Sequence, residues 1–163
     1  MRVLLFDIDG TLLVTDDGGK IALEAALADE FELSAVDVAI SFAGRTDRSL
    51  LRELLERNQL DASERNHKRL AKRYSAYLPK VLDQCDGEIL PGVTDLLENL
   101  AAQDNLLCYV MTGNLGETAT HKLNHFGLAR YFQGVFGGDH DSERDDLARR
   151  TAADLRDRHR SEE

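Results

Sequence analysis

The sequence predicts an α/β fold, namely a Rossmann-like doubly wound parallel sheet with an inserted α-helical cap. Short apolar runs of strand type alternate with helical patterns at the start and in the second half of the chain, which is typical of parallel sheets. Between them, only helical patterns occur. We therefore assign residues 1–14 and 89–163 to an α/β core domain whose last strands are missing from the sequence, and residues 15–88 to a helical cap domain.

The composition indicates a water-soluble globular protein with one sizeable core, since 42% of the 163 residues are hydrophobic and 31% are charged. The net charge of −10 argues against a nucleic-acid partner, because phosphate backbones require clustered positive charge. No apolar run reaches bilayer length and no secretion signal is visible, so we expect no membrane partner and a cytoplasmic location. Cys85 and Cys108 show no metal-site or disulfide spacing and are expected to be reduced thiols.

The first element is a strand at residues 3–6, where four consecutive apolar residues suit a strand buried on both faces. It runs into the sequence DIDGTL, so Asp7 and Asp9 follow the strand directly, and Gly10 lets the chain turn. Carboxylates are costly to bury without partners. Two of them at the end of a buried strand therefore indicate a reaction centre rather than a surface loop.

The next elements are three helices. Leu23, Leu27 and Phe31 recur every four residues and predict a helix over residues 19–31. A second helix is expected at residues 48–57, and a third begins near Asp61, where D-A-S-E forms a plausible capping box. Since no strand pattern interrupts them, these helices are expected to form one compact unit.

The second half returns to alternating elements. A helix has Val93, Leu96, Leu97 and Leu100 as its apolar face. A buried strand follows at residues 106–111 and ends in Thr-Gly-Asn, and a helix over residues 115–126 stops at Gly127, a typical residue after a helix end. A short strand at residues 134–136 and a charged C-terminal helix complete the pattern.

Both polar motifs follow strands, and ligands of open parallel sheets bind beyond the carboxyl ends of the strands. Asp7 is a candidate nucleophile toward phosphorus, and Asp9 a candidate general acid–base residue. A cation such as Mg²⁺ is needed between these carboxylates and a phosphate dianion. Thr112 supplies a hydroxyl, and the Gly113 and Asn114 amides open a helix whose N-terminal end favours anions.

The motifs DIDGTLL and VMTGN make the chain similar to the haloacid dehalogenase-like hydrolases, in the phosphoglycolate-phosphatase-like branch with a helical cap. GRTDRSLLRELL resembles the cap segment of that branch, and the likeness extends over nearly all of residues 1–155. The resemblance implies that Asp7 is the nucleophile, that Asp9 is the acid–base residue, and that Thr112 hydrogen-bonds the phosphoryl group. It also implies that the Asp7 carboxylate and the Asp9 backbone carbonyl bind Mg²⁺.

The chain departs from the family in its third motif, which normally offers a lysine at the start of the helix after the third strand. Here that position reads S-E-R-D-D, and Arg144 is the nearest cation. Arginine can hold phosphate with two hydrogen bonds, so we assign Arg144 to phosphate binding. Lys122 is the competitor, but it falls in the middle of an expected helix.

A second departure concerns the fourth motif, a further apolar strand that ends in acidic metal ligands. After Leu155 the chain reads RDRHRSEE, which contains no aliphatic residue. Asp139 and Asp141 follow the third strand but do not match this motif, and a polar surface loop is the alternative for them. Without a further strand, residues 3–6 become a sheet edge, so self-association is expected.

We read the chain as a Mg²⁺-dependent phosphatase that hydrolyses a small phosphorylated metabolite through an aspartyl-phosphate. Arg45, Thr46 and Asp47 are the cap residues expected to face the substrate. Dehalogenation is disfavoured, because the dehalogenases of the family lack the second aspartate. A phosphomutase, which uses the same two aspartates, and a non-catalytic or truncated member that acts by binding remain as alternatives.

Overall fold

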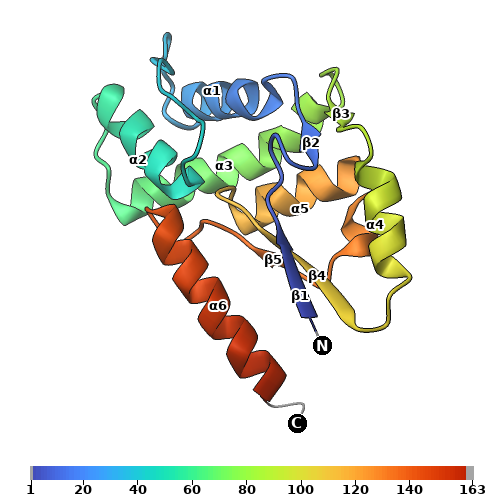
Figure 1. Ribbon diagram of the computed structural model, residues 1–163. Helices are drawn as coiled ribbons and strands as arrows, with labels where there is room; N and C mark the ends of the chain where they lie inside the picture. Colours follow the sequence, from blue (N-terminus) through green and yellow to red (C-terminus); the bar gives the residue numbers. More distant parts are fainter. Residues whose placement is uncertain (1, 161–163) are drawn as a thin grey trace.

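The structure is a computed structural model that describes residues 2–160, with side chains to residue 158 (Figure 1). Strands and helices alternate outside a purely helical segment, as the sequence predicts. In chain order the elements are β1 (Arg2–Phe6), β2 (Leu13–Val14), α1 (Gly18–Glu30), α2 (Asp47–Arg57), α3 (Glu64–Leu82), β3 (Glu88–Ile89), α4 (Val93–Ala101), β4 (Leu106–Met111), α5 (Gly116–His125), the 3-10 turn η1 (Ala129–Tyr131), β5 (Val135–Phe136) and α6 (Arg144–Arg160).

The main sheet is parallel and has the order β1-β4-β5. Phe6, the last residue of β1, lies opposite Val110, and Val110 in turn lies opposite Val135. The three strands therefore end at nearly the same level, so the loops that follow them lie at one edge of the sheet. The parallel sheet and its flanking helices confirm the predicted fold class.

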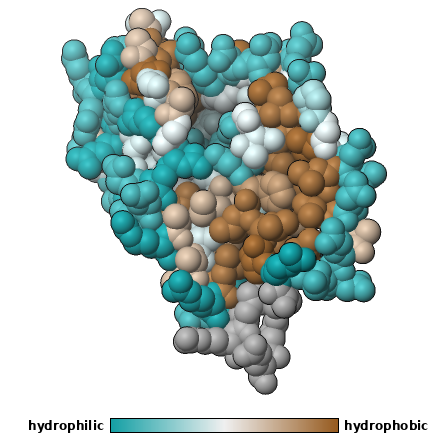
Figure 2. Space-filling view, viewed as in Figure 1, coloured by the Kyte–Doolittle hydropathy of each residue, from teal (hydrophilic) through white to brown (hydrophobic). Residues whose placement is uncertain are grey.

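β1 lies at the edge of this sheet, since β4 is its only partner among residues 2–160. The expectation that residues 3–6 are buried on both faces is wrong for Leu5, which is 42% exposed because nothing described here covers that side of the strand. Leu96 of α4 is exposed as well, and Figure 2 shows apolar surface over this part of the molecule. Self-association through this edge stays a prediction.

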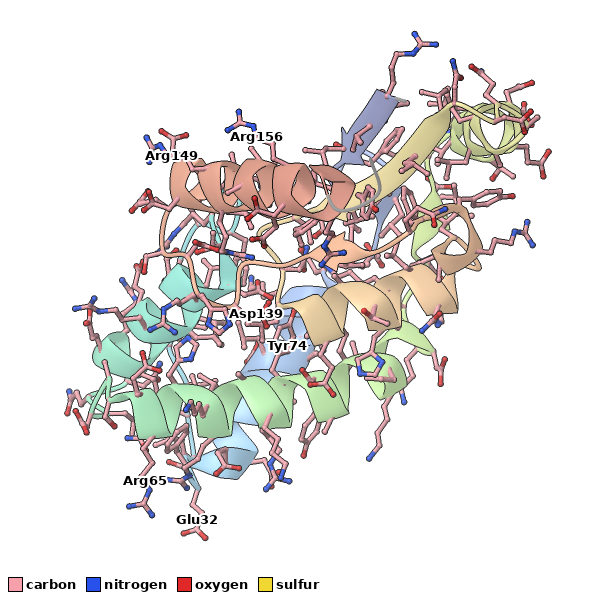
Figure 3. The ribbon with its side chains drawn as sticks, turned by 90° about the horizontal axis from the view of Figure 1, so that it is seen from below. Glu32, Arg65, Tyr74, Asp139, Arg149 and Arg156 are labelled. Atoms are coloured by element: carbon pink, nitrogen blue, oxygen red, sulfur yellow. The ribbon has the colours of Figure 1, made fainter. Side chains whose placement is uncertain are left out.

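Helices cover the sheet on two sides, with α6 on one side of β5 and α5 on the other (Figure 3). Side chains of β4 alternate between the two. Tyr109 packs with Leu155 of α6, whereas Val110 packs with Leu97 of α4 and Leu123 of α5.

The three helices α1, α2 and α3 surround an apolar cluster of their own (Figure 1). Before and after this unit, β2 and β3 pair as antiparallel strands, with Leu13 opposite Ile89. The chain therefore enters and leaves the helical segment at one place, which agrees with the boundaries inferred for the cap, although the division into two domains remains an interpretation. None of the helices within residues 2–160 combines the length and apolar composition needed to cross a membrane.

One predicted helix start is displaced. The α3 helix begins at Glu64 with Ser63 as its N-cap, whose hydroxyl accepts a hydrogen bond of 3.5 Å from the Asn66 amide. Asp61 lies outside the helix, and its carbonyl oxygen accepts from the Asn66 side chain. The D-A-S-E pattern contains two residues that can cap, and the fold uses the second one.

The apolar face of α4 is narrower than the sequence predicts. Leu97 is 1% exposed, but Leu96 is 47% exposed. We expect Leu97→Ala to lower the free energy of unfolding by about 2–5 kcal/mol, because it removes buried methyl groups and leaves a cavity. The matched change Leu96→Ala should cost less than about 1 kcal/mol. Urea denaturation of both variants measures the difference, and equal losses would contradict the packing described here.

Candidate active site

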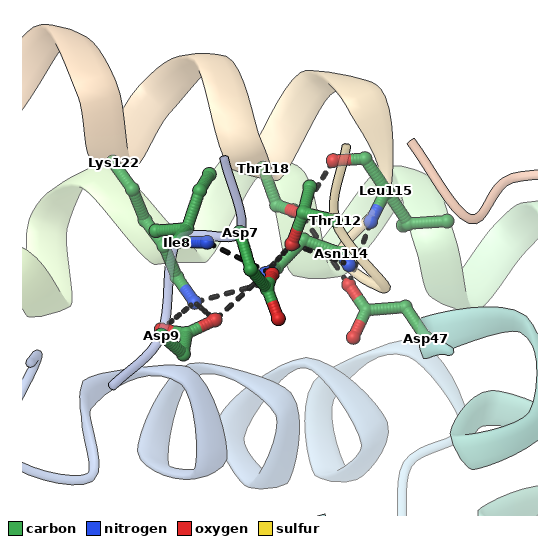
Figure 4. A network of polar contacts seen from close by, with 9 residues as sticks. All are labelled: Asp7, Ile8, Asp9, Asp47, Thr112, Asn114, Leu115, Thr118 and Lys122. Carbon is green, nitrogen blue, oxygen red and sulfur yellow. Dashed lines mark hydrogen bonds and ion pairs between the residues drawn. The ribbon is translucent and has the colours of Figure 1, made fainter. Parts of the chain in front are cut away.

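The candidate site lies where β1 and β4 end. Asp7 directly follows β1, and Thr112 directly follows β4. Because the two strands pair in register at Phe6 and Val110, these residues lie next to each other although they are far apart in sequence. Figure 4 shows the aspartates of the first motif facing Thr112 and Asn114 of the second. The structure thus brings the two motifs together, as expected from the sequence.

Asp7 has a hydrogen-bond donor on each oxygen. Its Oδ1 accepts a bond of 2.8 Å from the Ile8 amide, and its Oδ2 accepts a bond of 2.7 Å from the Arg144 guanidinium. Arg144 is the first residue of α6, and its side chain is 33% exposed. A small anion that approached Asp7 would therefore meet a positive charge beside it. The assignment of Arg144 to phosphate binding stays a prediction.

Asp9 faces a different cation. Its carboxylate accepts bonds of 2.7 and 2.8 Å from Lys122 Nζ and one of 2.7 Å from Asn114 Nδ2 (Figure 4). Lys122 Nζ also donates to Asn114 Oδ1 at 2.8 Å. The Lys122 side chain is 4% exposed, so a nearly buried charge is fully paired.

The sequence argues against Lys122 as a site residue because this residue falls inside a helix. The structure shows that this argument does not hold. α5 runs past the site, and the long lysine side chain reaches Asp9 from its last turn. Helical periodicity gave no signal for this, because Asn114 lies before the helix begins and an offset of eight residues turns the chain by about 80°. Both cations of the sequence analysis therefore reach the site, Arg144 at Asp7 and Lys122 at Asp9.

Thr112 and Asn114 form the wall opposite the aspartates. Thr112 is fully buried, and its Oγ1 accepts hydrogen bonds from the Asn114 side chain at 2.8 Å and from the Asn114 amide at 3.3 Å. Since both bonds use Oγ1 as the acceptor, the hydroxyl proton can be donated to an oxygen atom of a ligand.

The cap loop at residues 45–47 is held tightly against the core. The Asp47 amide donates to the Gly113 carbonyl at 2.7 Å, and Thr46 Oγ1 donates to the Ser142 carbonyl at 3.1 Å. A methyl group on Gly113 would collide with the Arg45 carbonyl, and one on Gly138 would press on Thr46. The two glycines therefore permit the close approach of the cap loop to the core.

The three expected cap residues differ in their orientation. Arg45 and Asp47 line the cavity between cap and core, whereas Thr46 is fully buried beside Ser142. The Arg45 guanidinium turns back to Glu53 at 2.5 Å rather than toward the aspartates. Asp47 accepts a hydrogen bond of 2.8 Å from the Leu115 amide at the start of α5.

The cavity has a volume of about 660 Å³ and contains both aspartates. The core side of the cavity is mostly polar, and the cap side combines apolar and aromatic side chains with charged ones. From the core it is lined by Asp7, Asp9, Thr112, Gly113, Asn114, Lys122 and Arg144, and from the cap by residues that include Leu23, Phe42, Arg45, Asp47, Leu50 and Tyr74.

The donors for a metal ion are few. The part of the chain that the structure describes contains no cluster of three or more His, Cys, Asp or Glu side chains suited to a metal. Asp139 accepts a hydrogen bond of 2.9 Å from the Gly116 amide, and Asp141 pairs with Arg150 at 2.6 Å. Both carboxylates are therefore engaged in other contacts. Asp7 and Asp9, which stand directly at the end of β1, are themselves paired with Arg144 and Lys122.

The buried Asp47 predicts a pH effect on stability. Burial raises the pKa of Asp47 from 3.8 to about 6, against the opposing effects of the Leu115 amide and the Lys122 charge. Between these values the folded chain keeps a proton that the unfolded chain loses, so stability falls as the pH rises from about 4 to about 6 and then levels off.

Asp47→Asn is the reference variant, because its side-chain oxygen can still accept a hydrogen bond from the Leu115 amide but carries no titrating proton. Relative to this variant, the free energy of unfolding of the wild type should fall by about 3 kcal/mol as the pH rises from about 4 to about 6. Urea denaturation of both proteins in a chelating buffer at several pH values measures the difference. A difference independent of pH would show that Asp47 does not titrate there.

Comparisons with known proteins identify relatives of this chain. Pyrimidine 5′-nucleotidase PynA of Streptococcus pneumoniae is 28% identical over 150 residues, which cover 83% of this chain and 60% of that protein. The chain thus spans less than two thirds of the length of this curated relative.

Two solved structures share the fold. A predicted phosphatase from Clostridium acetobutylicum has a TM-score of 0.65 at 22% identity, over 95% of this chain and 70% of its own. CbbY from Rhodobacter sphaeroides, solved in complex with phosphate, has a TM-score of 0.71 at 17% identity, over 95% and 72%. The family model described as haloacid dehalogenase-like hydrolase matches residues 4–149, so the chain belongs to the haloacid dehalogenase-like hydrolases.

Proposed function

We propose that the chain acts as a Mg²⁺-dependent phosphatase that hydrolyses a small phosphorylated metabolite through an aspartyl-phosphate. One observation carries the proposal: two carboxylates at the end of one strand share a cavity but have different partners. Asp7 lies beside the Arg144 guanidinium, which is partly exposed, whereas Asp9 is held by Lys122 and Asn114. Family membership and the nucleotidase relative support the same class of reaction.

In the first step, an Asp7 carboxylate oxygen attacks phosphorus, the P–O bond to the alcohol breaks, and an aspartyl-phosphate forms. Asp7 follows directly on a strand and is fixed by the Ile8 amide, so its carboxylate is positioned before substrate binds. Arg144 binds the phosphoryl oxygens, and the Thr112 hydroxyl donates to another of them. The developing negative charge therefore meets fixed donors.

Asp9 transfers the protons. It donates one to the leaving alcohol and later takes one from the water that hydrolyses the aspartyl-phosphate. Lys122 and Asn114 fix the orientation of its carboxylate through three hydrogen bonds. The same group can thus serve both steps without moving far.

The residues present fit a magnesium ion. We assign its protein ligands to the Asp7 carboxylate and the Asp9 backbone carbonyl, because Mg²⁺ prefers oxygen donors and is commonly held by one or two carboxylates together with waters and substrate phosphate. When bound, the ion supplies positive charge between the Asp7 carboxylate and the phosphate dianion. The Asp9 carboxylate is paired with Lys122, and the assignment of its backbone carbonyl as a ligand follows from the resemblance to the family.

The nucleophile is tested by Asp7→Asn, which keeps the shape of the side chain and removes its charge. We expect an unchanged circular-dichroism spectrum and at least about a thousandfold slower release of inorganic phosphate from p-nitrophenyl phosphate with Mg²⁺. A chelator should abolish the wild-type rate. Wild-type turnover by the folded variant would exclude the proposed nucleophile, and transfer of phosphate to a second hydroxyl, without release, would indicate a phosphomutase.

The phosphate-binding role of Arg144 is tested separately. With Arg144→Ala, competitive inhibition by inorganic phosphate should weaken by about 10- to 100-fold, because a charge-assisted hydrogen bond is lost. Arg149→Ala is the matched control, since Arg149 lies on the same helix, has a side chain that is 73% exposed, and pairs with Asp146. Unaltered inhibition of Arg144→Ala would assign the phosphate to other donors.

A further inference from the structure

Tyr74 of α3 reaches the active-site cavity from the cap side. Its ring belongs to the apolar cluster of the cap, and the residue is only 3% exposed. Figure 3 shows Tyr74 between α3 and α5. It lines the same cavity as both aspartates. Its hydroxyl is not one of the fully buried, unpartnered polar atoms of the described residues, so it opens into the cavity, where a ligand can reach it.

The hydroxyl lies close to the catalytic groups. A methyl group built on Gly19, at the start of α1, would stand 3.4 Å from the Tyr74 hydroxyl and 4.0 Å from Lys122 Nζ. Both groups thus face the space beside Gly19, and Lys122 is bonded to Asp9. The glycine leaves room there for about a methyl group, and Tyr74 and Lys122 line the same cavity as Asp7.

The chemical state of the hydroxyl is well defined. Burial, and then the charges of Asp47 and Asp9, raise the pKa of Tyr74 well above its ordinary value. The hydroxyl therefore keeps its proton and offers both a donor and an acceptor. Packing alone would not require it, because a phenylalanine would fill the same space in the apolar cluster.

The surroundings restrict what can reach this hydroxyl. Leu23, Phe42 and Leu50 supply apolar cavity wall on the cap side. The cap side also contributes polar groups: the Tyr74 hydroxyl, the Asp47 carboxylate, of which Oδ2 is bonded to the Leu115 amide, and the side chains of Thr15, Asp16, Asp17, Lys20 and Arg45. A leaving group that presents a hydroxyl toward Tyr74 and carbon atoms toward the leucines would match this wall.

We propose that Tyr74 is a specificity-determining residue that hydrogen-bonds a hydroxyl of the leaving group, so that the substrates are phosphate monoesters of polyhydroxylated alcohols, namely sugar or nucleoside phosphates. This proposal rests on the proposed phosphatase function. A site built to bond a substrate hydroxyl discriminates strongly against analogues that lack it, because its own polar group then stays unpaired.

The test compares Tyr74→Phe with wild type on three substrates: ribose 5-phosphate, uridine 5′-monophosphate, and p-nitrophenyl phosphate, whose leaving group carries no further hydroxyl. The variant should lose about tenfold in kcat/KM on at least one of the first two, mainly through KM, and stay within about twofold of wild type on the third. Which of the two is affected distinguishes sugar from nucleoside phosphates. Tyr77→Phe, three residues along the same helix and hydrogen-bonded to Asp29, is the control and should resemble wild type on all three.

Equal losses on all three substrates would overturn the proposal in favour of a structural role, and so would unchanged kinetics. If the wild type hydrolyses none of them, the phosphatase function fails by itself, and calorimetric titration then tests Tyr74. In that case, weaker binding of ribose 5-phosphate or uridine 5′-monophosphate to Tyr74→Phe, with unchanged binding of inorganic phosphate, supports the contact. Unchanged binding of all three ligands excludes it.

Discussion

The pairing of the Lys122 ammonium with the Asp9 carboxylate is the interaction on which the rest of the site depends. A lysine that is almost completely buried would destabilise the fold by several kcal/mol without a partner, so the pair constrains everything around it. α5 must start directly behind the strand end and run past Asp9, and Asn114 must turn inward to bond both members of the pair. The first motif, the second motif and the helix after it are thereby held in one arrangement by a single network of charges and amides.

Much of this arrangement could be predicted from the sequence, for identifiable reasons. The run of apolar residues from 106 to 111 predicts β4 with its observed bounds, and Asp7 and Thr112 then meet if β1 and β4 are neighbours, as they are in the structure. Other features depend on tertiary neighbours that a one-dimensional pattern does not contain. Leu5 and Leu96 look like core residues but are exposed, because burial depends on what packs against each side of a strand or helix. Lys122 looks like a surface residue of a charged helix, and only the position of Asp9 makes it part of the site.

The glycines at positions 113 and 138 are also explained by their tertiary neighbours. Neither has a positive φ angle. A side chain on Gly113 would collide with the Arg45 carbonyl of the cap loop, and one on Gly138 would meet the Gly113 carbonyl first and then Thr46. A sequence motif such as Thr-Gly-Asn therefore combines two requirements, polar atoms that face the ligand and a missing side chain that accommodates the cap. The cap and the core share this surface, so a change on one side of it alters the cavity on both.

The short pair formed by β2 and β3 has a mechanical consequence. It joins the two crossings between core and cap through the contact of Leu13 with Ile89, so the crossings are not independent tethers. Because these two attachment points are fixed to each other, the cap helices can rotate about their common location, whereas translation or twisting relative to the core is opposed. Motion of the three cap helices would then follow a single hinge axis, and opening the cavity would first have to break the hydrogen bonds that hold the loop at residues 45–47 to the core.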